Sequence, residues 1–220
     1  MKTFLTIVGI MLLCAAGLQA GVLIQDGFDD GGRTNGTDAQ DADWWLVYSY
    51  TLDVNASGGL GSGNALSVVV TGNSLFLANF PNQILDGDGD RMTLKFDFQI
   101  LEQANSTIRF GLLNANGTPV ETDVDVDDLA DDDGGYFFRL ATGSGTDSKF
   151  YEDSGTSSPL GGGDLATRTS AVFGINDTNV HSVKMTYTYA EGTIEVAVTI
   201  DEGTPAEFNL SWTDSSSLKQ

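Results

Sequence analysis

The sequence has few of the residues that bind transition metals or form disulfides. Its 220 residues include one cysteine and one histidine. The cysteine, Cys14, lies in an N-terminal segment that we expect to be removed, so the mature chain has no disulfide framework and no cysteine-type zinc site. A single histidine, His181, excludes histidine-rich metal sites.

Positive charge is also scarce. Ten Lys and Arg residues stand against 31 Asp and Glu, and the formal net charge is −21. Nucleic acids and anionic membranes both attract clustered basic side chains, so we expect neither as a partner. Hydrophobic residues make up 40% of the chain, which is enough to bury a core and argues against a disordered acidic tail.

The N-terminus reads as a signal peptide over residues 1–20. Lys2 supplies a positive charge, residues 4–18 are apolar, and Ala20 is a small residue at the expected cleavage point. Leu13, directly before Cys14, argues against lipidation, and an uncleaved anchor is the less favoured alternative. The mature protein, residues 21–220, is therefore expected to be secreted or held at the cell surface, without membrane insertion.

Alternation of apolar and polar residues dominates the mature chain and predicts β-strands. The four prolines fall between the alternating runs, as expected for residues that cannot donate to a sheet ladder. One apolar face per strand requires two sheets packed face to face. We therefore predict a single all-β domain, an antiparallel two-sheet β-sandwich. The predicted strand runs are 22–25, 44–52, 65–70, 75–80, 92–100, 108–112, 136–140, 181–189, 194–200 and 208–212.

The same alternation predicts the core and one hairpin. A turn at Glu191-Gly192 should join the runs 181–189 and 193–200 as neighbours in one sheet. The residues expected between the two sheets are Leu94, Phe96, Phe98, Phe110, Phe138, Val183, Met185, Ile194, Val196 and Val198.

Two short motifs carry a family resemblance: the stretch 61–66, GSGNAL, and the hairpin that begins HSVKMTY at His181 and continues to Asp201. Both resemble segments of concanavalin A-like and laminin-G-like jelly rolls. Val180 replaces the tryptophan of the family pattern, and Glu202 separates Asp201 from Gly203. The resemblance implies a jelly roll in which the strand at 22–25 lies near the C-terminal end of the chain.

The segments 26–33 and 43–45 resemble secreted, surface-sorted proteins of Gram-negative environmental bacteria. Those relatives end in a Pro-Glu-Pro signal, an apolar helix and a basic tail, which this sequence lacks before Gln220. Either the protein is released freely or the sequence is C-terminally truncated.

No residue pattern predicts catalysis. Glycosidases of this fold resemble one another in an E-x-D-x-x-E strand, whereas Glu195 and Asp201 are separated by about 20 Å of extended chain, too far for a carboxylate pair. No Gly-x-Ser-x-Gly is present, and His181 has no nucleophile beside it in sequence. We therefore predict that the protein is not an enzyme.

Clustered aspartates are candidates for Ca²⁺, which binds oxygen ligands. Two clusters lie at 26–30 and 86–90, and a third acidic stretch runs from Asp123 to Asp133. The alternative for each cluster is a solvated acidic loop. We name Asp26 and Asp29 first and expect them to bind Ca²⁺ at a sandwich edge with oxygens from a distant segment. The candidate metal ligands are Asp26, Asp29, Asp30, Asp86, Asp88 and Asp90.

Exposed aromatic rings are candidates for sugar binding, and the alternative, favoured for each single residue, is packing in the core or in an interface. Trp44 and Trp45 are adjacent, so one should point outward from a strand. The candidate ligand-binding residues are Trp45, Tyr151 and Trp212. The sequence thus predicts a non-catalytic recognition or adhesion domain that binds an extracellular glycan. The alternative is a structural component of a matrix or cell surface with no small ligand.

Overall fold

The computed structural model describes residues 23, 26–28, 30–34, 41–47, 51–55, 64–69, 75–101, 106–114, 119–123, 134–142, 147–154 and 166–214. Within these ranges the chain forms twelve strands and no helix, so it contains no helix that could span a membrane. The strands are β1 (Trp44–Val47), β2 (Thr51–Asn55), β3 (Ala65–Val69), β4 (Leu75–Ala78), β5 (Arg91–Gln99), β6 (Ser106–Asn114), β7 (Gly134–Thr142), β8 (Asp147–Ser154), β9 (Ala166–Val172), β10 (Val180–Ala190), β11 (Thr193–Ile200) and β12 (Phe208–Asp214).

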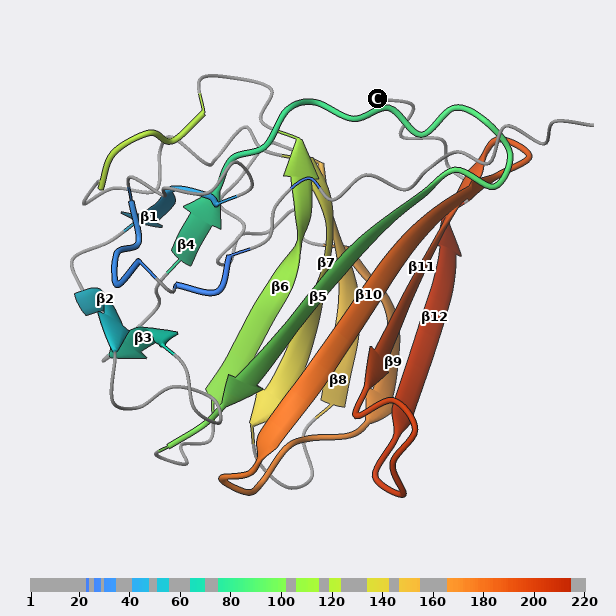
Figure 1. Ribbon diagram of the computed structural model, residues 1–220. Helices are drawn as coiled ribbons and strands as arrows, with labels where there is room; N and C mark the ends of the chain where they lie inside the picture. The colour runs from blue at the N-terminus through green and yellow to red at the C-terminus, as the bar shows by residue number, and fades with distance from the viewer. Residues whose placement is uncertain are drawn as a thin grey trace, which may run out of the picture.

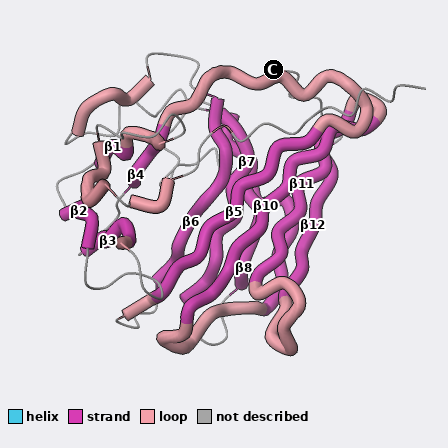
Figure 2. The backbone as a smooth tube through the Cα atoms, viewed as in Figure 1, coloured by secondary structure: helices cyan, strands magenta, loops and turns pink. Residues whose placement is uncertain are grey.

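Eight strands form two four-stranded antiparallel sheets packed face to face (Figure 1). The front sheet has the order β12-β11-β10-β5, and the back sheet has the order β6-β7-β8-β9. The chain passes from front to back between β5 and β6 and returns between β9 and β10. Two further antiparallel pairs, β1-β4 and β2-β3, are drawn apart from the large sheets in Figure 2. The predicted all-β sandwich is therefore confirmed.

The core lies between the two large sheets because each strand turns its apolar side chains to the same side. In β10, Val183, Met185 and Tyr187 are buried, whereas Ser182 directly before them is exposed and Lys184 and Thr186 between them are partly exposed. All ten residues predicted for the core belong to this cluster: five are fully buried, and Leu94, Phe96, Phe98, Phe110 and Ile194 pack against them partly buried.

Polar bonds through the core also join the sheets. The Tyr187 hydroxyl, from the front sheet, donates to the carbonyl oxygen of Tyr136 and accepts from the N–H of Leu112, each at 2.9 Å. Leu112 and Tyr136 oppose each other in the back sheet. Burial raises the pKa of Tyr187 well above its ordinary value, so the hydroxyl remains protonated and can donate. A second bond between the sheets runs from the Tyr136 hydroxyl to the Asp214 carboxylate.

The strand predictions were right for the long runs and wrong in two places. The predicted hairpin is confirmed, because β10 and β11 are antiparallel neighbours joined at Glu191-Gly192, both with positive φ. The single strand predicted over 44–52 is wrong: β1 pairs with β4, and β2 pairs with β3. The alternation runs through both strands and cannot reveal that the chain changes partner between them. Strands β8 and β9 were not predicted, and the segment 22–25 lies outside the described residues except for Leu23.

Candidate functional site

The outward face of the back sheet carries two rows of side chains that run across its strands. One row contains Gly111, Phe137, Tyr151 and Thr167, which are paired in register from β6 to β9. Phe137 and Tyr151 alternate with the core residues Phe138 and Phe150, so their side chains point away from the front sheet. The Phe137 and Tyr151 rings stack, with centroids 5.5 Å apart and an interplanar angle of 19°.

The second row lies beside the first and is basic. Arg109 opposes Arg139, and Arg139 opposes Lys149. The Arg109 guanidinium lies 5.8 Å from the Phe137 ring centroid and 5.9 Å from that of Tyr151, while Arg139 lies 5.7 Å from Tyr151. Burial lowers the pKa of Arg109, and the charge of Arg139 acts in the same direction, although an arginine stays protonated at neutral pH.

Of the three predicted ligand-binding aromatics, Tyr151 alone lies on this face. Trp45 is in β1 and pairs with Leu77 of β4, and its side chain is partly buried. Trp212 points into the sandwich, where it packs against the core cluster and lies 5.6 Å from the Tyr136 ring. The structure therefore does not bring the three aromatics together, and a proposed platform has to rest on Tyr151.

The N-terminal aspartates bond to nearby backbone and to one tryptophan. One carboxylate oxygen of Asp26 accepts from the N–H of Phe28 at 2.9 Å, and the other accepts from Trp44 Nε1 at 2.7 Å. Asp30 accepts from the N–H of Gly32 at 2.9 Å. Asp29 lies outside the described residues. A Ca²⁺ ion at Asp26 would therefore have to share oxygens that already accept hydrogen bonds.

The aspartates at 86–90 organise a turn that docks on the β10-β11 hairpin. The Asp90 carboxylate accepts from the N–H groups of Gly87 and Asp86, at 2.8 and 3.3 Å. Asp88 accepts from the N–H of Glu191 at 2.7 Å. The backbones of Asp90 and Gly89 also bond to Tyr189. These bonds give two of the three carboxylates a structural role.

In the third acidic stretch, Asp123 is described and forms a bidentate ion pair with Arg33. It also accepts from the N–H of Leu46 at 2.9 Å, so it ties β1 to a distant loop. The Arg33 hydrogen bond lowers the pKa of Asp123. Residues 124–133 lie outside the described part. Among the described residues no group of three or more His, Cys, Asp or Glu side chains is placed to hold a metal ion.

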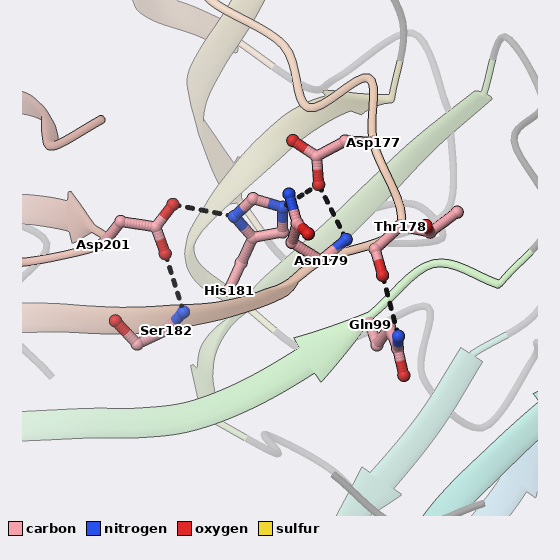
Figure 3. Close-up of polar contacts among 7 residues, drawn as sticks. All are labelled: Gln99, Asp177, Thr178, Asn179, His181, Ser182 and Asp201. Carbon is pink, nitrogen blue, oxygen red and sulfur yellow. Dashed lines mark hydrogen bonds and ion pairs between the residues drawn. The ribbon is translucent and has the colours of Figure 1, made fainter. Parts of the chain in front are cut away.

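A histidine between two aspartates closes one end of the front sheet (Figure 3). His181 Nδ1 lies 2.7 Å from Asp201 Oδ2, and His181 Nε2 lies 2.9 Å from Asp177 Oδ1. The carboxylates are held in turn by the N–H groups of Ser182 and Asn179. Sequence analysis missed this cluster, because Asp177 comes from the loop before β10 and Asp201 from the turn after β11, and no sequence motif includes Asp177.

The geometry favours the charged form of His181. Two carboxylate acceptors can both receive a hydrogen bond only from an imidazolium, in which both ring nitrogens donate. Burial acts to lower the pKa of His181, but the hydrogen bonds to Asp201 and Asp177 outweigh burial and raise the pKa above its ordinary value. No serine, threonine or cysteine side chain is hydrogen-bonded to this ring, since both nitrogens are occupied by aspartates. The cluster can therefore act as a structural bridge.

Comparison of the chain with protein-family models, with curated proteins and with solved structures finds no match in any of the three.

Proposed function

We propose that this protein is a secreted, non-catalytic recognition domain of the concanavalin A-like type, and that it binds an extracellular glycan on the outward face of the back sheet. The observation that carries the proposal is the Phe137–Tyr151 stack beside two arginines. An aromatic ring offers a flat apolar surface to the C–H face of a sugar, and nearby polar groups can bond to its hydroxyls. Phe137 is 4% exposed, so Tyr151 is the accessible ring and Phe137 holds it in place.

The secreted location is supported by the signal-peptide pattern of residues 1–20 and by the strongly acidic composition. Calcium stabilisation belongs to the same proposal. It rests on the abundance of carboxylate ligands and on the neighbourhood of Asp26, Asp30 and Asp41, which lie close together beside Arg33.

A glycan array followed by calorimetry tests the binding face. We expect Tyr151→Ala to weaken binding of the best array ligand by about tenfold, because the stacking surface is lost. Tyr151→Phe keeps the ring and should retain most of the affinity. Both variants should keep the wild-type melting midpoint to within a few degrees.

Trp45→Ala is the matched variant at the other predicted ligand-binding aromatic that lies outside the core cluster. If it abolishes binding and Tyr151→Ala does not, the glycan binds on the β1-β4 pair and the proposed face is wrong. If no glycan binds the wild-type protein, the alternative of a structural surface or matrix component is favoured.

A further inference from the structure

The basic row on the back sheet is an unusual arrangement for a chain of this composition. Three of the ten basic residues, Arg109, Arg139 and Lys149, oppose one another directly on adjacent strands. Like charges placed opposite each other in a sheet destabilise it. Arg109 has further partners within the protein, so the neighbouring cations Arg139 and Lys149 are the two for which a counter-charge is sought.

The hydrogen bonds of the Arg139 guanidinium to the protein do not use all of its donors. Its Nη2 donates to the carbonyl oxygen of Asp147 at 3.0 Å. Its Nε is buried and donates to nothing. Over the part of the chain that the structure describes, neither Arg139 nor Lys149 pairs with a carboxylate. An arginine that is partly desolvated beside a second arginine gains most from an anionic partner that accepts two hydrogen bonds.

The front sheet also carries two opposed cations, but carboxylates of the protein lie beside them. Lys95 and Lys184 also oppose each other, on its outward face. There they line a shallow hollow with Asp97 and Glu202, and Lys184 Nζ lies 2.7 Å from Glu202 Oε1. That pair of cations is balanced by carboxylates of the protein itself, which makes it a matched reference for the row on the back sheet.

From this contrast we infer that the glycan is acidic: a carboxylate- or sulfate-bearing sugar stacks on Tyr151 and places its anionic group against Arg139 and Lys149. The inference rests on the proposed function and specifies its ligand class. Strands are spaced by about 4.8 Å, so Arg139 and Lys149, on adjacent strands, can contact one anionic group together.

The net charge of −21 limits how such a ligand can bind. A long polyanion is repelled by the rest of the surface, but at 0.15 M salt charges are screened beyond about 8 Å. Contacts within the row are shorter than this distance. A short acidic oligosaccharide is therefore the right probe, in buffer of physiological ionic strength.

The test uses the full mature protein and calorimetry with three probes: a galacturonate oligosaccharide, its fully methyl-esterified form, and a sulfated oligosaccharide of similar length. We expect the acid or the sulfated form to bind at least about tenfold more tightly than the neutral ester, because charge-assisted hydrogen bonds are lost in the ester. The comparison of carboxylate with sulfate identifies which anion the row prefers.

Variants that each remove one positive charge show where the acidic probe binds. Arg139→Gln and Lys149→Gln should each weaken binding of the acidic probe about tenfold, whereas Lys95→Gln on the front sheet should leave it unchanged. If Arg139→Gln does not fold, as judged by its melting midpoint, the Lys149→Gln variant carries the test. Equal binding of acid and ester, or folded row variants that bind like wild type, would overturn the inference while glycan binding through Tyr151 stands. Failure of all three probes, together with a glycan array on which nothing binds, would overturn both.

Discussion

At the scale of single residues, the most informative side chain is His181. It is the chain's one histidine, it is 7% exposed, and both of its ring nitrogens face aspartates. The bridge joins the turn after β11 to the loop before β10. Asp201 adopts a φ of 55°, a left-handed conformation that aspartate tolerates better than most residues. The ion pairs therefore link two turns that the β10-β11 hairpin separates in the sequence.

The bridge makes stability depend on pH in a predictable direction. A histidine whose pKa is raised by folding contributes its full stability below the unfolded value of about 6.5 and loses it as the pH rises through the folded value. We expect the free energy of unfolding of the wild-type protein, from urea titrations, to fall between pH 6 and pH 9.

His181→Phe keeps the ring packing against Phe98 but removes both bonds. It should cost about 1–3 kcal/mol at pH 6, because Asp177 and Asp201 lose their shared partner, and it should flatten the pH dependence. A wild-type protein that gains stability over this pH range would contradict the charged bridge.

At the scale of elements, alternation predicted the strands whose inward positions are uniformly apolar. β5 places Met92, Leu94, Phe96 and Phe98 on one side, and β10 and β11 follow the same pattern, so their faces could be assigned from the sequence. β8 was missed because its inward side chains are Ser148, Phe150 and Glu152, of which one is apolar. Ser148 is buried through hydrogen bonds to Ala141 and Phe173, which the alternation of apolar residues does not encode.

The candidate site was predicted only in part, because it also depends on features that the alternation of apolar residues does not encode. Tyr151 could be named from its residue type, but its partners Arg109 and Phe137 are set by the register of three strands. Register depends on long-range pairing, and a shift of one residue would turn Arg139 into the core. From the sequence alone, an aromatic ligand-binding residue could therefore be predicted, but the rows of side chains around it on the outward face could not.

Close packing of β6 against β7 leads to a prediction about Gly111. A Cβ at this position would lie 2.2 Å from the carbonyl oxygen of Tyr136 and 2.6 Å from the Cα of Phe137, so the backbone of one strand would have to move. We expect Gly111→Ala to cost about 3 kcal/mol of unfolding free energy, measured by urea denaturation, because a rigid backbone cannot give way as a side chain can.

Gly192→Ala is the matched comparison for Gly111→Ala. Gly192 has open space around it and a φ of 86°, so the substitution should cost only the strain of a left-handed alanine, about 1 kcal/mol. If Gly111→Ala is the milder of the two variants, β6 and β7 are less tightly joined than the geometry indicates, and the rows on the outward face are less rigid.

At the scale of the whole molecule, a two-sheet core must overcome a large negative charge. The sheets are held by apolar packing and by buried bonds such as that of Tyr187 to the back-sheet backbone. The repulsion among 31 acidic side chains opposes this packing, and it weakens as added salt shortens the screening length. Monovalent salt alone should therefore raise the melting midpoint, and any specific effect of calcium must exceed this general one.

The calcium proposal is tested by melting the protein in Ca²⁺, Mg²⁺ and chelator at one fixed ionic strength. A site that binds Ca²⁺ only in the folded state adds about 2.7 kcal/mol at a hundredfold excess over its dissociation constant, so we expect a higher midpoint in Ca²⁺ than in Mg²⁺. Asp26→Asn should remove this difference, whereas Asp88→Asn, whose carboxylate bonds to the N–H of Glu191, should retain it. Equal midpoints in the two ions, with no calcium retained in native mass spectra, would contradict the proposal. The acidic side chains would then act as a solvated surface, with Asp26 serving to hold Phe28 and Trp44 in place.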